Sequence, residues 1–149
     1  MIGIKFKVPN TYDNVLYKIL NNILCENCVW KIDEDEVLDE NNNFLFDNEI
    51  YSDIEFNKII KSEKYYPIFL NLQLYNNDGI MSNIVDYKDF INSDCKLILF
   101  IVDNIYVEIY SKDEYYLKLI EKNAHENNFF DIEIINDKNN NRKKFCVHY

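Results

Sequence analysis

Every residue from position 97 to position 102 is apolar (LILFIV), so a strand formed there has no polar face. Such strands lie inside a sheet and are covered on both sides. Asp103 and Asn104 interrupt the run, and both residue types tolerate the positive φ angles of tight turns. The β-branched and aromatic residues on either side favour strands over a buried helix. The pattern predicts a central hairpin with a two-residue turn, with Val102 opposite Ile105 and with Leu99 and Ile101 fully buried.

Four other segments have apolar residues at helical spacing, and each follows a residue that can cap a helix. Two of the caps belong to capping boxes, in which a glutamate three residues later returns the hydrogen bond. The predicted helices follow Asn10, Ser52, Asp86 and Ser111, and the glutamates of the two boxes are Glu55 and Glu114. The first helix is expected to extend to Ile23 and the last to about Asn127.

Shorter runs of alternating or apolar residues predict strands at residues 2–8, 29–32, 44–46, 65–75, 130–134 and 145–149. Pro67 would place the beginning of one of these strands at an edge of the sheet. Hairpins mixed with short helical crossovers are typical of an α+β fold. We therefore predict one α+β domain over residues 1–149, with about four helices against a largely antiparallel or mixed sheet of about seven or eight strands.

The charge balance excludes several classes of partner. The chain carries 26 acidic and 16 basic residues, which gives a net charge of −10. Nucleic acids and anionic membranes both require a basic surface, so neither is an expected partner. The sequence contains no signal-peptide pattern and no apolar run of membrane-spanning length. We expect a cytoplasmic protein whose four cysteines are reduced.

The cysteines and histidines offer little chemistry. Cys25 and Cys28 form a C-x-x-C pair, but the pair follows a predicted helix, where the helix dipole has the wrong sign for activating a thiol. A zinc site would need two more ligands, and the candidates Cys95, Cys146 and His148 include no second closely spaced pair. Neither His125 nor His148 belongs to a catalytic motif. A Cys–His pair formed in space stays open, but we expect no catalytic residue, no cofactor and no metal.

The most unusual local feature is the acidic run DEDEVLDE at residues 33–40, which has six carboxylates. We expect it to form a loop between the strands at 29–32 and 44–46. Such a loop either keeps the protein soluble or attracts a basic partner by charge. The spacing does not match a calcium-binding EF-hand loop. Trp30 beside the run is either a core residue or an interface anchor. The candidate partner-binding residues are Trp30, Asp33, Glu34, Asp35, Glu36, Asp39 and Glu40.

Two stretches, KFKVPNTYDNVLYKIL followed by VWKI and SDCKLILFIVDNIYVEIYSKDE, carry a resemblance. They resemble the opening and the central block of an uncharacterised family of cytoplasmic proteins, about 150 residues long, from Gram-positive low-GC bacteria. The resemblance covers nearly the whole chain and implies a domain of unknown function. Its motifs are structural, so it supplies no active-site residue.

These observations lead to two hypotheses of function. The first is a non-enzymatic module that binds a basic protein, for example an immunity-type protein that neutralises a basic toxin. The second is a small-ligand-binding or enzymatic domain that uses an aromatic-lined pocket, because 15% of the residues are aromatic. A flat acidic and aromatic patch would favour the first hypothesis. A deep pocket with convergent polar groups would favour the second.

Overall fold

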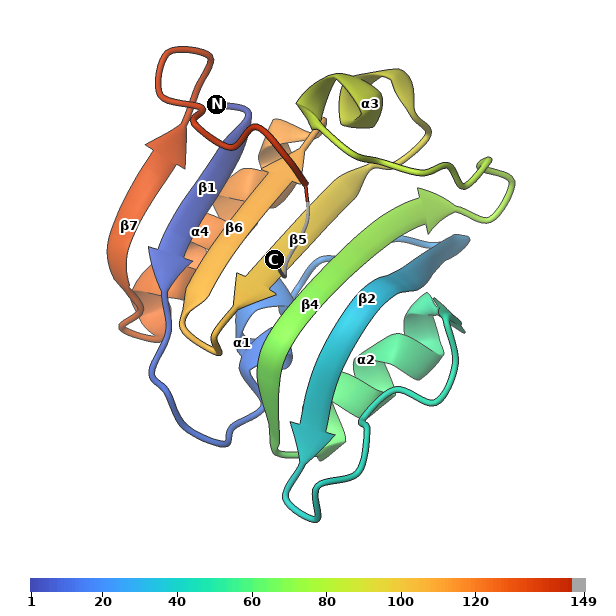
Figure 1. Ribbon diagram of the computed structural model, residues 1–149, viewed down its shortest axis with the longest axis vertical. Coiled ribbons are helices and arrows are strands. Elements are labelled where there is room, and N and C mark those ends of the chain that lie inside the picture. Colours follow the sequence, from blue (N-terminus) through green and yellow to red (C-terminus); the bar gives the residue numbers. More distant parts are fainter. Residues whose placement is uncertain (146–149) are drawn as a thin grey trace.

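The computed structural model describes residues 1–145, and within them one antiparallel sheet of seven strands has the order β3-β2-β4-β5-β6-β1-β7 (Figure 1). The strands are β1 (Gly3–Lys7), β2 (Cys28–Asp39), β3 (Ile50–Ser52), β4 (Tyr65–Asn76), β5 (Leu97–Val102), β6 (Tyr106–Ser111) and β7 (Phe130–Ile135). The helices are α1 (Val15–Leu20), α2 (Asp53–Ser62), α3 (Tyr87–Asn92) and α4 (Glu114–Glu126). The predicted α+β class is confirmed, and strands and helices follow one another in the predicted order through β7, with β3 at Ile50–Ser52 in place of the strand expected at 44–46.

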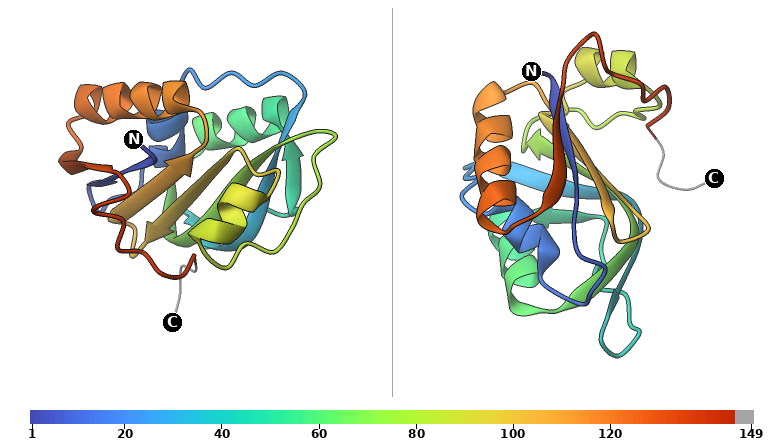
Figure 2. Two further views of the ribbon diagram at one scale, coloured as in Figure 1. Left: turned by 90° about the horizontal axis from the view of Figure 1, so that it is seen from above. Right: turned by 90° about the vertical axis from the view of Figure 1, so that its left-hand side faces the viewer.

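The two faces of the sheet are covered differently. Helices α1, α2 and α4 pack against one face, which we call the helix face (Figure 2). On the opposite face, which we call the open face, α3 and residues 136–145 cover only part of the sheet (Figure 2). Phe145 in that segment packs against Phe100 and Tyr110. Among residues 1–145, the open face therefore has less covering structure than the helix face.

The central hairpin forms as predicted, but in a different register. Leu99 and Ile101 are fully buried on the helix face, which confirms the expected interior strand. Asp103 and Asn104 have φ angles of 55° and 56°, as the turn requires. Val102, however, pairs with Tyr106 and not with Ile105, so the turn has three residues (103–105) and not the predicted two. The shift of one residue places the apolar residues of β6 on the same face as Leu99 and Ile101, and this matching of apolar faces sets the register.

Pro67 lies where its missing N–H group can be tolerated. Strand β5 pairs only with Phe69–Leu74 of β4, so the first residues of β4 extend beyond it. Pro67 pairs with Val37 of β2 alone. The beginning of β4 is therefore an edge on one side, as the proline predicts, although β4 as a whole is an interior strand.

The first helix is much shorter than predicted. It begins at Val15, and Asn10 does not cap it. Asp13 instead forms a β-bridge with Tyr65, and its backbone exchanges hydrogen bonds with that residue at 3.3 and 3.1 Å. The bridge holds the preceding residues in an extended path, so the helix cannot start before Asn14. The helix ends at Leu20, three residues before the predicted end at Ile23.

Two of the three other predicted caps are confirmed. The Ser52 hydroxyl accepts a hydrogen bond from the Glu55 N–H at 3.2 Å, and the Glu55 carboxylate returns one to the Ser52 N–H. The Asp86 carboxylate caps α3 by accepting a hydrogen bond from the Asp89 N–H at 2.8 Å. The prediction for Ser111 is wrong, because this residue is the last of β6. Asp113 caps α4, since the strand extends into the predicted first turn.

Two predicted strands differ in the structure. Residues 44–46 do not form one, because Phe44 makes only a single bridge to Leu38, and the strand that pairs with the start of β2 is β3. Phe145 lies outside any strand, and Val147 and Tyr149 lie beyond the described residues. Among residues 1–145, no helix is both long enough and apolar enough to cross a membrane.

Candidate functional site

The acidic run lies in a strand and not in a loop. Strand β2 continues without interruption from Cys28 to Asp39 and pairs with β4 along its length. The expected loop is wrong because the twelve residues of β4 offer backbone partners to the whole acidic segment. Backbone pairing therefore fixes the direction of each carboxylate in the run.

A bulge in β2 decides which carboxylates reach the open face. Ile32 pairs with Leu72, and the next pair is Glu34 with Asn71, so Asp33 is an extra residue. An extra residue reverses the alternation of side chains. Glu34 and Glu36 therefore lie on the open face, while Asp35 lies on the helix face.

The side chain of Asp35 points to the helix face, away from Glu34 and Glu36 on the open face. It pairs with Leu70, which belongs to the core on the helix face. Its Oδ2 atom is buried and has no hydrogen-bond partner among the residues that the structure describes. Burial raises the pKa of Asp35. Its prediction as a partner-binding residue therefore does not fit its position.

Trp30 is a core residue and does not lie at the surface. Its side chain is 1% exposed and stacks on Phe56 of α2, with 4.7 Å between the ring centroids. The indole Nε1 donates a hydrogen bond of 2.9 Å to Asp53. Trp30 points to the helix face because it lies two residues before Ile32, ahead of the bulge. Its expected place in a binding surface is thus incorrect.

Three other residues of the acidic run either interact with neighbouring residues of the protein or lie in the turn after β2. The carboxylate of Asp39 accepts hydrogen bonds from the N–H groups of Asn41 and Asn43, at 2.8 and 3.0 Å, so it organises the turn after β2. Glu40 is exposed in that turn. Asp33 pairs with Lys31 at 3.3 Å. The seven predicted residues therefore do not form one continuous surface.

A row of paired residues crosses the open face of the sheet. Each residue of the row lies directly opposite the next on the neighbouring strand, and the charges alternate toward the β7 edge. The row consists of Glu34, Asn71, Phe100, Glu108, Lys5 and Glu133. Side chains paired in this way on one face stand close enough to interact.

Arg142 connects this row with the segment after β7. Its guanidinium lies over the Phe100 ring, 4.7 Å from the centroid, and its Nε pairs with Glu108. The Tyr110 hydroxyl lies 2.9 Å from Asn140 Oδ1 and 3.2 Å from the Glu108 carboxylate. Burial, followed by the charge of Glu108, raises the pKa of Tyr110. This group was not predicted from the sequence, although Arg142 stands out as the only arginine of the chain.

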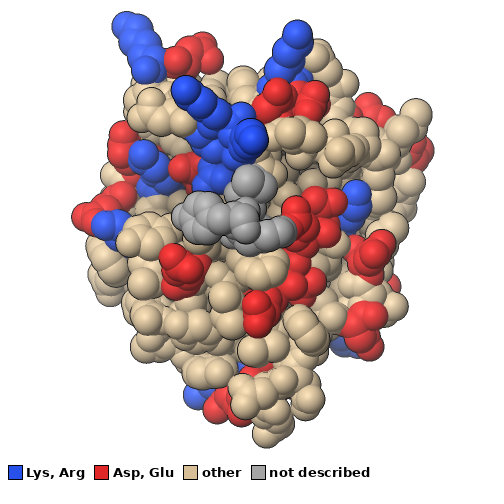
Figure 3. Space-filling model, in the orientation of Figure 1, with Lys and Arg blue, Asp and Glu red and all other residues tan. Residues whose placement is uncertain are grey.

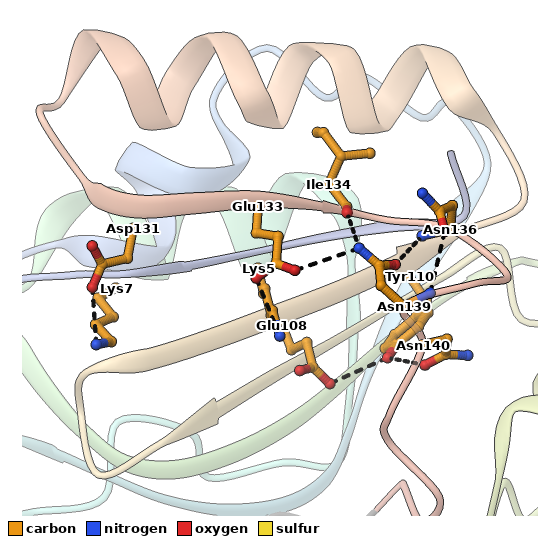
Figure 4. Close-up of polar contacts among 10 residues, drawn as sticks. All are labelled: Lys5, Lys7, Glu108, Tyr110, Asp131, Glu133, Ile134, Asn136, Asn139 and Asn140. Carbon is orange, nitrogen blue, oxygen red and sulfur yellow. Dashed lines mark hydrogen bonds and ion pairs between the residues drawn. The ribbon is translucent and has the colours of Figure 1, made fainter.

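A cavity of about 370 Å³ opens beside Arg142, between β1, β6 and β7. Across it Lys5 pairs with Glu133 at 3.4 Å and Lys7 with Asp131 at 2.9 Å (Figure 4). The hydrogen bond and the charge of Asp131 raise the pKa of Lys7. The lining is mostly charged and its cations are paired with carboxylates, so this cavity is not the aromatic-lined pocket of the second hypothesis.

The lower part of the open face carries both acidic and aromatic side chains. Figure 3 shows acidic side chains running down this face, with basic side chains gathered above and to the left. A second row of directly opposed residues crosses the lower part of this face, one on each of β2, β4, β5 and β6. These residues are Glu36, Phe69, Val102 and Tyr106. Tyr106 is 51% exposed, and Asp103 is exposed in the adjoining turn. We call Glu34, Glu36, Phe69, Val102, Asp103 and Tyr106 the open-face patch.

The structure also corrects the expected state of the cysteines. Cys25 and Cys28 are joined in a disulfide, because the turn between them brings their Cα atoms to 5.5 Å. Cys95 is a free, buried thiol whose pKa burial raises to about 12. Cys146 and His148 lie outside the described residues. Among residues 1–145, no group of three or more His, Cys, Asp or Glu side chains is arranged to hold a metal ion.

Comparison with known proteins identifies the family. Residues 1–146 match the model of DUF2691, a family described as proteins of unknown function. The chain belongs to this family. It is also 32% identical to the uncharacterised protein YncE of Bacillus subtilis strain 168, over 97% of this chain and 98% of the relative. No solved structure matches. The resemblance seen in the sequence is confirmed: the relative has a similar length and comes from a low-GC Gram-positive bacterium.

Proposed function

We propose that this protein is a binding module whose open-face patch receives a basic protein in the cytoplasm. The observation that carries the proposal is the position of Glu36 and Asp103 around Val102 and Tyr106 on a partly uncovered sheet face. Carboxylates steer and orient a basic partner, while aromatic and apolar side chains supply most of the lasting affinity.

The net charge of −10 supports the choice of a basic occupant. Exposed charge pairs contribute only about 0.2–1 kcal/mol each, so charge alone does not hold a tight complex. Tyr106 is large, amphipathic and half exposed, which suits it to be an anchor in the middle of an interface. Among proteins that bind a basic partner, the example suggested by the sequence is an immunity protein that neutralises a basic toxin.

The partner can be identified by photo-crosslinking in the native host. A photoreactive amino acid replaces Tyr106 in one version of the protein and Lys118 of α4 in the control. Both positions are exposed, but they lie on opposite faces of the sheet. We expect a basic protein to be crosslinked from position 106 only. Equal crosslinking from both positions, or capture of acidic proteins alone, would contradict the proposal.

The role of the carboxylates is then tested with the purified partner. The variant Glu36→Gln/Asp103→Asn removes two charges from the patch, and Glu121→Gln/Glu126→Gln removes two from α4. Two exposed pairs correspond to a loss of affinity of about 2- to 30-fold at low salt. We expect this loss, and a weaker dependence of the on-rate on salt, only for the first variant. Equal effects of the two variants would show that net charge, and not the patch, controls binding.

A further inference from the structure

The Cys25–Cys28 disulfide lies in a turn that other segments hold in place. The Asn27 carbonyl accepts a hydrogen bond of 2.8 Å from the Asn77 N–H, and Asn27 itself has a φ angle of 56°. The turn borders a cavity of about 500 Å³, whose other side is formed by the first residues of α2 and by Asn77. The sulfur pair is thus anchored to the end of β4 and lines this hollow, with Cys25 7% and Cys28 3% exposed.

Lys96 brings a positive charge to one sulfur of the pair. Its Nζ atom lies 3.4 Å from Cys25 Sγ and 3.4 Å from Asn76 Oδ1. The backbone fixes its position, because the Lys96 N–H donates to the Leu74 carbonyl at 2.8 Å. An ammonium group beside a cysteine favours the thiolate. Cys25 is therefore the sulfur on which the protein stabilises a negative charge.

Cys28 has a different neighbour. Its Sγ lies 3.6 Å from Asn76 Oδ1, the same atom that accepts from Lys96. An ammonium group can only donate, so the Asn76 atom facing it is the amide oxygen. That oxygen accepts a hydrogen bond and thus favours the protonated thiol at Cys28. The two sulfurs are therefore unequal, with a thiolate favoured at Cys25 and a thiol at Cys28.

The dipole of α1 does not act against redox chemistry at this pair. The sequence pattern had placed the cysteines at the C-terminal end of the first helix. In the structure α1 ends at Leu20, and the helix that borders the cavity is α2, through its N-terminal residues Ser52 and Asp53. The effect of a helix dipole falls off within its last turn, so α1 does not oppose a thiolate at Cys25.

We propose that Cys25 and Cys28 form a redox-active pair that exchanges with a disulfide in a protein substrate. In the reduced protein, the Cys25 thiolate attacks one sulfur of the substrate disulfide and releases the other as a thiolate, which takes a proton from water. Cys28 then loses its proton to water and attacks Cys25 Sγ, which releases the second substrate sulfur as a thiolate that is also protonated. The products are two substrate thiols and the Cys25–Cys28 disulfide, which a thiol reductant returns to the dithiol.

A protein substrate is favoured by two apolar side chains near the cavity. Leu24 is 82% exposed and Ile54 is 77% exposed, and both line the hollow beside the cysteines. Leu24 precedes the C-x-x-C pair, and Ile54 lies in the first turn of α2. Apolar residues next to a substrate cysteine would cover both side chains, whereas a small hydrophilic disulfide would not.

The first test measures the reactivity of the two sulfurs. Folded protein is equilibrated in glutathione buffers, and alkylation by iodoacetamide is located by peptide mass mapping. We expect a reversible two-electron couple in which Cys25 is alkylated before Cys28. Lys96→Met should slow alkylation of Cys25 at pH 7 by roughly 3- to 10-fold. Lys96→Arg should restore it, and Lys118→Met on α4 should have no effect. A disulfide that is reduced only on unfolding, or a faster reaction at Cys28, would overturn the proposal.

The second test identifies the substrate class by trapping. Cys28→Ser should accumulate a mixed disulfide with a peptide disulfide flanked by leucines, and Cys25→Ser should not. Leu24→Ser/Ile54→Ser should slow exchange with that peptide and leave exchange with hydroxyethyl disulfide unchanged. Equal slowing with both substrates would contradict a protein substrate. Absence of trapping in Cys28→Ser would contradict the assigned roles of the two cysteines.

Discussion

Leu99 of β5 lies directly opposite Ile109 of β6, and neither side chain is exposed to solvent. The pair lies on the helix face, where a truncated side chain leaves a cavity that the surrounding strands cannot close. Leu99→Ala should lower the free energy of unfolding by roughly 2–5 kcal/mol, measured by chemical denaturation. Leu24→Ala, at a position that is 82% exposed, should change it by less than about 0.5 kcal/mol. A loss at Leu99 as small as that of the control would contradict an interior position.

The capping box of α2 gives a second prediction. Ser52→Ala removes the hydroxyl that accepts from the Glu55 N–H and should cost about 0.5–2 kcal/mol. Ser52→Asp retains an acceptor at this position and should recover most of the loss. Both variants are compared in urea at neutral pH. An equal loss of stability in both variants would mean that the missing cap does not cause the destabilisation.

Arg142 allows a third prediction through its pairing with Glu108. Both side chains are largely shielded from solvent, with exposed fractions of 22% and 19%. Arg142→Met leaves the carboxylate without this partner and should cost about 1–3 kcal/mol. The double variant Glu108→Gln/Arg142→Met should recover part of that loss, because the unpaired charge is gone. Additive losses in the double-mutant cycle would contradict coupling between the two residues.

Asp35 predicts a dependence of stability on pH. Burial raises the pKa of its carboxyl group, so between the ordinary and the raised value the folded protein binds more protons than the unfolded chain. The contribution of this group to stability therefore falls as the pH rises through that interval, and the full penalty is present at neutral pH.

The variant Asp35→Asn has no carboxyl group to ionise at this position. It should be more stable than the wild type at pH 7, and its advantage should shrink as the pH is lowered toward about 4. Urea denaturation of both proteins across this range measures the difference. A difference that stays constant with pH would show that ionisation of Asp35 is not its cause.

The fold was largely predictable because local signals agreed with the tertiary structure. The apolar run at 97–102 and the turn at Asp103 and Asn104 identified the central hairpin. Its register was not accessible from the turn alone, since it depends on which residues of β6 must join Leu99 on the helix face. The short first helix was missed for a similar reason: the bridge between Asp13 and Tyr65 joins residues far apart in the sequence.

The surface was harder to predict than the fold. Continuing the alternation from Trp30 and Ile32 would place Glu34 and Glu36 on the helix face. The bulge at Asp33 reverses this, and nothing in a run of four carboxylates shows where an extra residue is inserted. Arg142 was missed because its partners lie on β5 and β6, distant in sequence. The disulfide was not foreseen because the expectation of reduced thiols came from the cellular compartment and not from geometry.

The short length of β3 has a consequence for self-association. Among residues 1–145, the sheet continues beyond β2 only with β3, which pairs with Val29–Lys31 and ends before the acidic run begins, while the segment between the two strands bonds to β2 at isolated points such as Val37 and Leu38. Strands whose outer edge is not fully covered can recruit a second molecule into a growing fibril. A copy added here would align carboxylates with carboxylates, and their repulsion opposes such growth. The acidic stretch of β2 thus protects the protein from polymerising through its own sheet, whatever partner its open face receives.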